Sequence, residues 1–134
     1  MKHLVDTDWV VDYLKGKQLI VERLKTLAPD GLAISLITYG EIYEGIYYGR
    51  DPQRHELGFR NFLSGVTVLP LTPTIMRQFA RLRGELRGKG QLIGDPDLLI
   101  AATALHHDLT LLTHNSRHFT RIPGLRVEDD PAPQ

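Results

Sequence analysis

The chain has 134 residues, which is enough for one domain with a hydrophobic core. Its 42% hydrophobic and 24% charged residues are ordinary for a globular protein, and no apolar run approaches the roughly 20 residues of a membrane span. The absence of cysteine excludes disulfides and thiolate metal sites. The short N-terminal apolar run contains an acid and is unlike a signal peptide, so we expect a cytoplasmic protein without a membrane partner.

The first predicted strand lies near residue 3 and stops at the acid-rich run Asp6-Thr7-Asp8, before a helix. Ligands of open parallel sheets bind beyond the carboxyl ends of the strands, which makes Asp6 a candidate for chemistry. The alternative is that Asp6 merely ends the strand while Thr7 or Asp8 caps the helix. Another helix follows and ends before Pro29, and residues 32–35 predict the second strand.

The next predicted helix covers residues 36–48 and carries both a tyrosine stripe and a candidate acid. Its tyrosines recur every four residues, a pattern that more often reflects packing against a helix or another chain than recognition: Tyr39, Tyr43 and Tyr47. Glu41 lies among residues that look buried, where a carboxylate is costly unless it is paired or bound to a metal. The alternative is a solvated glutamate on a surface helix.

The middle of the chain is basic, although the net charge of the whole chain is zero. After a short helix and a strand near residue 66, Thr72-Pro73 begins a long amphipathic helix. Its polar face carries Arg77, Arg81 and Arg87. Two interpretations fit this face: a solvated surface, or a contact with nucleic-acid phosphates.

The stretch of residues 93–112 combines a turn, a mostly apolar helix and a short strand. The helix runs from Asp97 to about His106 and is apolar all round, which predicts that it is buried. Asp97 at its start is either a cap or a functional acid. Residues 109–112 predict a buried strand, which ends in a polar turn that contains Asn115.

Predicted strands near residues 3, 32, 66, 110 and 126 alternate with helices, which indicates an α/β fold with a parallel sheet covered on both faces. We expect one domain over residues 1–130 and a frayed tail over residues 131–134. If the predicted helix starts converge on one edge of the sheet, three carboxylates and one amide meet there. Carboxylates about 5 Å apart repel by about 3 kcal/mol at an effective dielectric of about 20, so the cluster needs a cation or protons. Oxygen-only ligands favour Mg²⁺ or Mn²⁺.

Four segments in this order resemble the PIN-domain ribonucleases and, within them, the VapC toxins of toxin–antitoxin pairs: LVDTDWVVDYL, ISLITYGEIYEGIYYG, IGDPDLLIAATAL and LTLLTHNSRHFTRIPGLRVED. The resemblance implies a three-layer α/β/α sandwich. It also implies that Asp6, Glu41 and Asp97 hold Mg²⁺ or Mn²⁺, with Asn115 at a fourth position. The metal of these enzymes activates a water that cleaves an RNA phosphodiester. Asp95 is a possible extra acid, but Asp97 directly precedes LLIAA, as the motif's acid does.

The resemblance further implies a homodimer and neutralisation by a small VapB antitoxin, whose groove we expect at the tyrosine stripe and the helices of residues 36–63. The RNA is expected to be tRNA or ribosomal RNA, read through its shape and single-stranded loops. Arginines on the basic helix and near the end of the chain are the candidate RNA contacts: Arg77, Arg81, Arg87 and Arg117. We expect the histidines to be structural or superficial, with His114 near the metal or RNA as the alternative.

Two other functions are weighed against a nuclease. Asp6-Thr7-Asp8 also fits the DxDx(T/V) signature of haloacid-dehalogenase-like phosphohydrolases, in which Asp6 would be the nucleophile and Asp8 a general acid. That fold needs a later lysine and an acidic pair at a strand end, whereas Asp95 and Asp97 precede a helix here. A PIN-like module that binds RNA or a partner without cutting is the third possibility.

Overall fold

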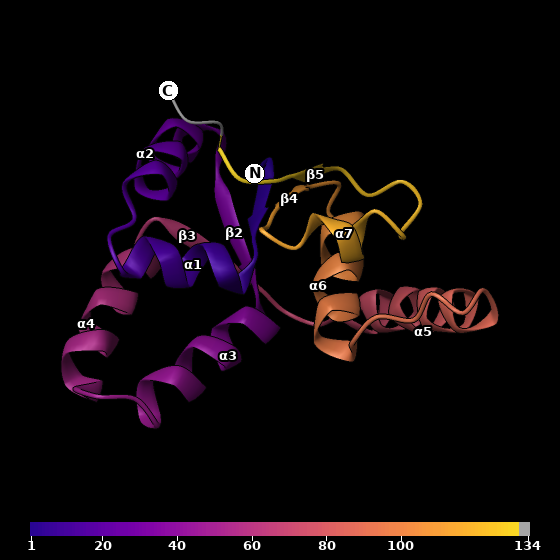
Figure 1. Ribbon diagram of the computed structural model, residues 1–134, viewed down its shortest axis with the longest axis horizontal. Coiled ribbons are helices and arrows are strands. Elements are labelled where there is room, and N and C mark those ends of the chain that lie inside the picture. Colours follow the sequence, from indigo (N-terminus) through magenta and orange to yellow (C-terminus); the bar gives the residue numbers. More distant parts are fainter. Residues whose placement is uncertain (132–134) are drawn as a thin grey trace.

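The computed structural model describes residues 1–131 and contains one five-stranded parallel sheet with the strand order β3-β2-β1-β4-β5 (Figure 1). The strands are β1 (His3–Val5), β2 (Leu32–Ser35), β3 (Val66–Leu69), β4 (Thr110–Leu112) and β5 (Val127–Glu128). The chain places β2 and β3 on one side of β1 and later adds β4 and β5 on the other. The carboxyl ends of β1 and β4 therefore flank the point where the strand order reverses, which is where open α/β sheets bind ligands.

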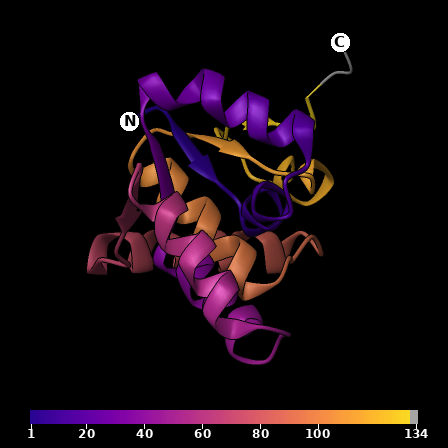
Figure 2. The ribbon, with the colours of Figure 1, turned by 90° about the vertical axis from the view of Figure 1, so that its left-hand side faces the viewer.

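Helices cover both faces of this sheet (Figures 1 and 2). One face carries α1 (Thr7–Leu14), α2 (Gln18–Leu27) and α4 (Pro52–Leu63), and the other carries α5 (Pro73–Gly88), α6 (Asp95–His106) and α7 (Ser116–Phe119). The remaining helices are α3 (Leu36–Tyr47), which follows β2 directly, and the short 3₁₀ helix η1 (Ala28–Asp30). No helix within residues 1–131 is long and apolar enough to cross a membrane.

Neighbouring residues of the strands point into two separate cores. Leu4 and Leu111 belong to the core beneath α5 and α6, whereas Val5 and Leu112 belong to the core beneath α1, α2 and α4. This alternation is what a strand covered on both faces produces. The predicted three-layer α/β/α sandwich is confirmed, as is the burial of α6, whose exposed fraction is 0–1% from Ile100 to Ala104.

The tyrosine stripe of α3 packs against α4, as its spacing predicted. The rings of Tyr39 and Tyr43 lie 4.9 Å apart, and each lies within 6 Å of Phe59, at 5.8 and 5.5 Å. The Tyr43 hydroxyl donates a hydrogen bond of 3.0 Å to Glu56. The stripe therefore joins two helices, while its last member, Tyr47, is 64% exposed.

The helix that carries Asp97 begins two residues earlier than predicted. α6 begins at Asp95 with Gly94 as its N-cap, so Asp97 is the third residue and not the first. Proline is favoured in the first turn of a helix, and Pro96 extends the helix towards the preceding turn. The predicted frayed tail lies outside the described residues, apart from Pro131.

Candidate active site

Asp6 is the most deeply buried acid at the carboxyl edge of the sheet. It follows β1 directly and caps α1, because its Oδ1 accepts a hydrogen bond of 2.8 Å from the Thr7 amide. Its Oδ2 accepts a bond of 2.7 Å from the Thr113 hydroxyl, and the residue is only 5% exposed. The cap of α1 is thus Asp6, not Thr7 or Asp8, and the capping role and the functional position coincide.

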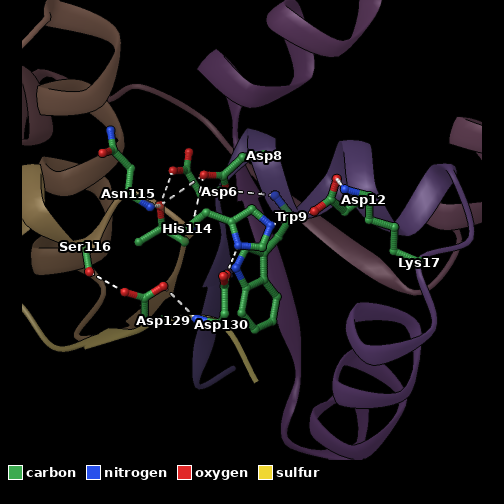
Figure 3. A network of polar contacts seen from close by, with 11 residues as sticks. Asp6, Asp8, Trp9, Asp12, Lys17, His114, Asn115, Ser116, Asp129 and Asp130 are labelled. Atoms are coloured by element: carbon green, nitrogen blue, oxygen red, sulfur yellow. Dashed lines mark hydrogen bonds and ion pairs between the residues drawn. The ribbon is translucent and has the colours of Figure 1, made fainter. Parts of the chain in front are cut away.

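The loop after β4 contacts Asp6 and contributes Thr113 and Asn115 to the site (Figure 3). The Thr113 hydroxyl oxygen accepts a hydrogen bond of 3.0 Å from the Asn115 amide while it donates to Asp6. Asp8 binds the same loop, because its Oδ2 accepts a bond of 3.1 Å from the His114 amide. The ends of β1 and β4 are therefore joined by side chains, and Asn115 stands next to Asp6.

Glu41 reaches the site through Thr7. The Thr7 hydroxyl donates a hydrogen bond of 2.7 Å to Glu41 Oε1 and lies 3.0 Å from the hydroxyl of the buried Thr38. Glu41 itself is exposed, so the expectation that it is a buried carboxylate is wrong. It faces an open pocket of about 350 Å³, lined by Leu36, Ile37, Gly40, Glu41, Glu44 and Pro96.

Asp97 approaches the loop after β4 from α6. Its Oδ2 lies 3.7 Å from His118 Nδ1, and the Asn115 side-chain amide lies 2.8 Å from the same nitrogen. Asp97 is 31% exposed, so solvent and substrate can reach it. Contacts through Thr7, Thr113 and His118 thus link the four predicted residues Asp6, Glu41, Asp97 and Asn115.

Asp95 points elsewhere. Its Oδ1 accepts a hydrogen bond of 2.9 Å from Arg83 Nε, which joins α6 to α5 on the surface. The choice of Asp97 over Asp95 agrees with this geometry.

The electrostatics of the site favour a bound cation. The pKa of Asp6 is raised from 3.8 to about 7, chiefly by burial and then by the charges of Asp8 and Asp97, while the hydrogen bonds from Thr113 and Thr7 act in the opposite direction. Burial likewise raises the pKa of Asp8. Burial and the neighbouring acids disfavour the ionised form of these carboxylates, and a bound cation stabilises that form. Oxygen donors with no thiolate suit Mg²⁺, which is usually held by one or two carboxylates together with waters and substrate phosphates.

A tighter group of possible ligands lies beside this site. Within residues 1–131, the compact group of acids and histidines is His114, Asp129 and Asp130, with ligand atoms within 4.8 Å of one another. Asp6, Glu41 and Asp97 are more widely spaced than that. His114 turns its ring away from Asp6, towards Asp12 and Asp130.

The candidate RNA contacts lie on two helices. Arg77, Arg81 and Arg87 are exposed on α5, and Arg117 is exposed on α7, next to His118. Arg77 contacts the hydroxyl of Thr74 at 3.2 Å. All four guanidinium groups are open to a phosphate ligand.

Sequence reasoning missed Thr7, Thr113 and His118 as members of the site. Thr113 follows β4 as Asp6 follows β1, so its place at a strand end was a usable signal. His118 comes three residues after Asn115 in a four-residue helix, and nothing in its spacing pointed to Asp97.

For the RNA cleavage that the resemblance implies, replacing Thr113 by valine is expected to lower the rate roughly 10- to 100-fold, because a hydrogen bond to a charged group contributes roughly 1.5–3 kcal/mol and each 1.36 kcal/mol is tenfold. Without this bond the pKa of Asp6 rises further, so the pH of half-maximal cleavage should move upward. A pH–rate profile measures both effects. Thr113→Ser keeps the hydroxyl and should resemble the wild type; a valine variant that also does so would remove Thr113 from the site.

Comparisons with known proteins identify the family of this chain. The PIN domain family model matches residues 3–125. The chain is 34% identical over 130 residues to Ribonuclease VapC2 of Haemophilus influenzae, covering 96% of this chain and 98% of the relative. It is 31% identical to the tRNA(fMet)-specific endonuclease VapC of Salmonella typhimurium, with the same coverage.

A solved structure, VapBC2 from Rickettsia felis bound to a DNA fragment from its promoter, superposes on this chain with a TM-score of 0.92. The match covers 98% of this chain and 100% of that one at 30% identity. The fold and the relatives agree along nearly the whole length. The chain therefore belongs to the PIN-domain family and, within it, to the VapC ribonucleases.

Proposed function

We propose that this chain is the toxin of a toxin–antitoxin pair, an endoribonuclease that depends on Mg²⁺ or Mn²⁺ and acts on cytoplasmic RNA. The observation that carries the metal dependence is Asp6, a buried carboxylate whose pKa is raised to about 7 beside two further acids. A divalent cation would relieve this cost and leave the acid ionised at neutral pH.

Asp6, Glu41 and Asp97 are the residues that would hold the metal. When bound, Mg²⁺ supplies an activated water and charge stabilisation for the phosphate oxygens. The chain contributes the preorganisation: Thr113 and the Thr7 amide fix both oxygens of Asp6, while the Thr7 hydroxyl orients Glu41. Asn115 and His118 bring polar groups to the rim near Asp97.

The substrate is proposed to be tRNA or ribosomal RNA, cut within an exposed loop. A relative that is 31% identical is a tRNA(fMet)-specific endonuclease, which favours tRNA. The open pocket beside Glu41 leaves room for RNA at the site. Unstacked bases of loops fit such surfaces better than paired bases do.

Replacing Arg81 and Arg87 together by glutamine should weaken RNA binding and reduce the slope of log K against log salt by about 1.4, since each lost phosphate contact removes about 0.7 for single strands. Binding titrations at several salt concentrations measure this slope. Arg126→Gln is the matched control, because Arg126 is engaged with Asp108 at 2.9 Å. An unchanged slope in the double variant would exclude α5 from the RNA footprint.

The partner is proposed to be a VapB-type antitoxin, and the toxin a homodimer. A similar chain occurs in the solved VapBC2 complex. The most exposed large apolar side chains of the described residues are Tyr47 and its neighbour Tyr48 at the end of α3, at 64% and 89%, and Leu57 in the middle of α4, at 63%. Large exposed apolar side chains favour protein contacts.

The proposal is tested by incubating the purified protein with pooled tRNA and ribosomal RNA in Mg²⁺, Mn²⁺ or EDTA, and mapping the cut ends. Discrete cuts that EDTA abolishes are expected. Cuts that persist in EDTA would overturn the metal dependence. A folded protein that binds RNA without cutting would overturn the nuclease in favour of a binding module.

A further inference from the structure

We propose that His114 is a positioning residue of the nuclease, which clamps the loop after β4 between α1 and the segment that follows β5. The inference rests on the proposed function, since the loop carries Thr113 and Asn115 of the candidate site. His114 stands between these two residues in the chain. Its ring, however, faces away from Asp6 (Figure 3).

The two ring nitrogens of His114 bind carboxylates from opposite ends of the chain. Nε2 lies 2.7 Å from Asp12 Oδ2 on α1, and Nδ1 contacts the carboxylate of Asp130, beyond β5. Lys17 lies 3.2 Å from the other oxygen of Asp12 and balances its charge. A carboxylate therefore lies against each of the two ring nitrogens.

The backbone of His114 is held as firmly as its ring. Its amide donates to Asp8 at 3.1 Å, and its ring lies 5.9 Å from the buried indole of Trp9. Both Asp8 and Trp9 belong to the first turn of α1, directly after Asp6. The clamp thus ties the loop to the same turn that carries the central acid.

The segment beyond β5 adds a second tie to the loop. The Ser116 hydroxyl, at the start of α7, donates to the carboxylate of Asp129. Asp129 and Asp130 lie after residue 125, where the match to the PIN family model ends. The end of this chain therefore supplies two acids that brace the loop from outside the matched region.

The consequence for the reaction follows from the short connection. Only three residues separate β4 from α7, so a shift at His114 moves Thr113 and Asn115 with it. Misplacing catalytic groups by about 1 Å can lower a rate about 100-fold. Substrate affinity should change less than kcat, because three of the four proposed RNA contacts lie on α5 and only Arg117 lies beside the loop, on α7.

The test compares steady-state cleavage by His114→Ala, Asp12→Ala and the double variant. Each single variant should lower kcat at least about tenfold with KM within about twofold, and the double variant should lose no more than the larger single loss, because both remove one clamp. Asp12→Asn keeps an acceptor oxygen and should restore most of the activity. A kcat for His114→Ala within about twofold of wild type would overturn the proposal.

Trp9 provides a readout that does not require activity, because it is the only tryptophan in the chain. Asp12→Ala should free Nε2 of the imidazole, leave Nδ1 against Asp130, and change the Trp9 emission in the native protein. Unchanged emission in Asp12→Ala would contradict the clamp, even if no variant cleaved RNA. A wild type that does not cleave RNA would count only against the proposed function.

Arg23→Gln is the matched control for a general loosening of the chain end. It breaks the two side-chain hydrogen bonds of 2.7 and 2.8 Å between Arg23 and Glu128, which hold β5 to α2. The backbone oxygen of Glu128, which accepts a bond of 3.1 Å from the Thr113 amide of the loop, is left in place. Its kcat and Trp9 emission should equal those of the wild type. A loss in Arg23→Gln as large as that in His114→Ala would overturn the specific role of His114.

Discussion

Replacing Asp97 by asparagine is expected to lower the rate of RNA cleavage by about 10²–10³-fold, because charge stabilisation by a bound metal contributes several kcal/mol and each 1.36 kcal/mol is tenfold. The substitution keeps the size of the side chain but removes one of the charges that would bind the cation. Since Asp97 is 31% exposed, the fold should tolerate the change. Cleavage of an end-labelled RNA under single-turnover conditions measures the loss.

Asp95→Asn is the control, because it is the same aspartate-to-asparagine substitution, two positions earlier on α6. Asp95 pairs with Arg83, and such exposed ion pairs contribute about 0–1 kcal/mol. Cleavage should stay within about threefold of wild type, a free-energy change of under 1 kcal/mol. Equal losses from the two substitutions would contradict the assignment of Asp97 to the site.

Replacing Asp6 by asparagine should abolish cleavage and, in EDTA at pH 8, stabilise the fold by roughly 2–4 kcal/mol at 1.36 kcal/mol per pKa unit. The pKa of Asp6 is raised from 3.8 to about 7 in the folded chain, chiefly by burial. Below pH 4 both states bind the proton, so the wild type is not penalised. Between pH 4 and 7 the unfolded state releases this proton while the folded state keeps it, so the wild type loses stability as the pH rises to 7 and levels off above it.

Urea unfolding of the wild type and Asp6→Asn from pH 4 to pH 8 in EDTA tests whether the variant is the more stable of the two. The stability difference should be small at pH 4 and grow towards pH 8. Adding Mg²⁺ at pH 8 should stabilise the wild type but not Asp6→Asn, since a cation offsets the charge. A wild type as stable as the variant at pH 8 in EDTA would show that burial does not strain Asp6.

The layers of the fold could be predicted because each element is marked locally. Apolar runs at the strands and all-round apolarity from Leu98 to Ala104 identify a covered parallel sheet without any knowledge of the partners. The strand order could not be predicted, because it depends on which strands pair over long sequence distances. The general rule for strand ends was nevertheless enough to bring Asp6 and Asn115 together.

The site itself was predicted less completely. Asp6, Asp97 and Asn115 were predicted from their positions and the resemblance. The prediction that Glu41 is buried was wrong, because helix periodicity cannot show that this face opens on a pocket. The ion pair between Asp95 and Arg83 could not be predicted from the sequence either, since Arg83 lies on another helix. Hydroxyl contacts such as Thr113 to Asp6 span 107 residues and require the tertiary structure.

The central claim is that a divalent cation binds among Asp6, Glu41 and Asp97, and crystals soaked in Mn²⁺ test it most directly through anomalous scattering. An anomalous peak in contact with Asp6 and Asp97 is expected, and it should disappear in crystals of Asp6→Asn. A peak found only at His114, Asp129 and Asp130, the more compact group, would contradict it.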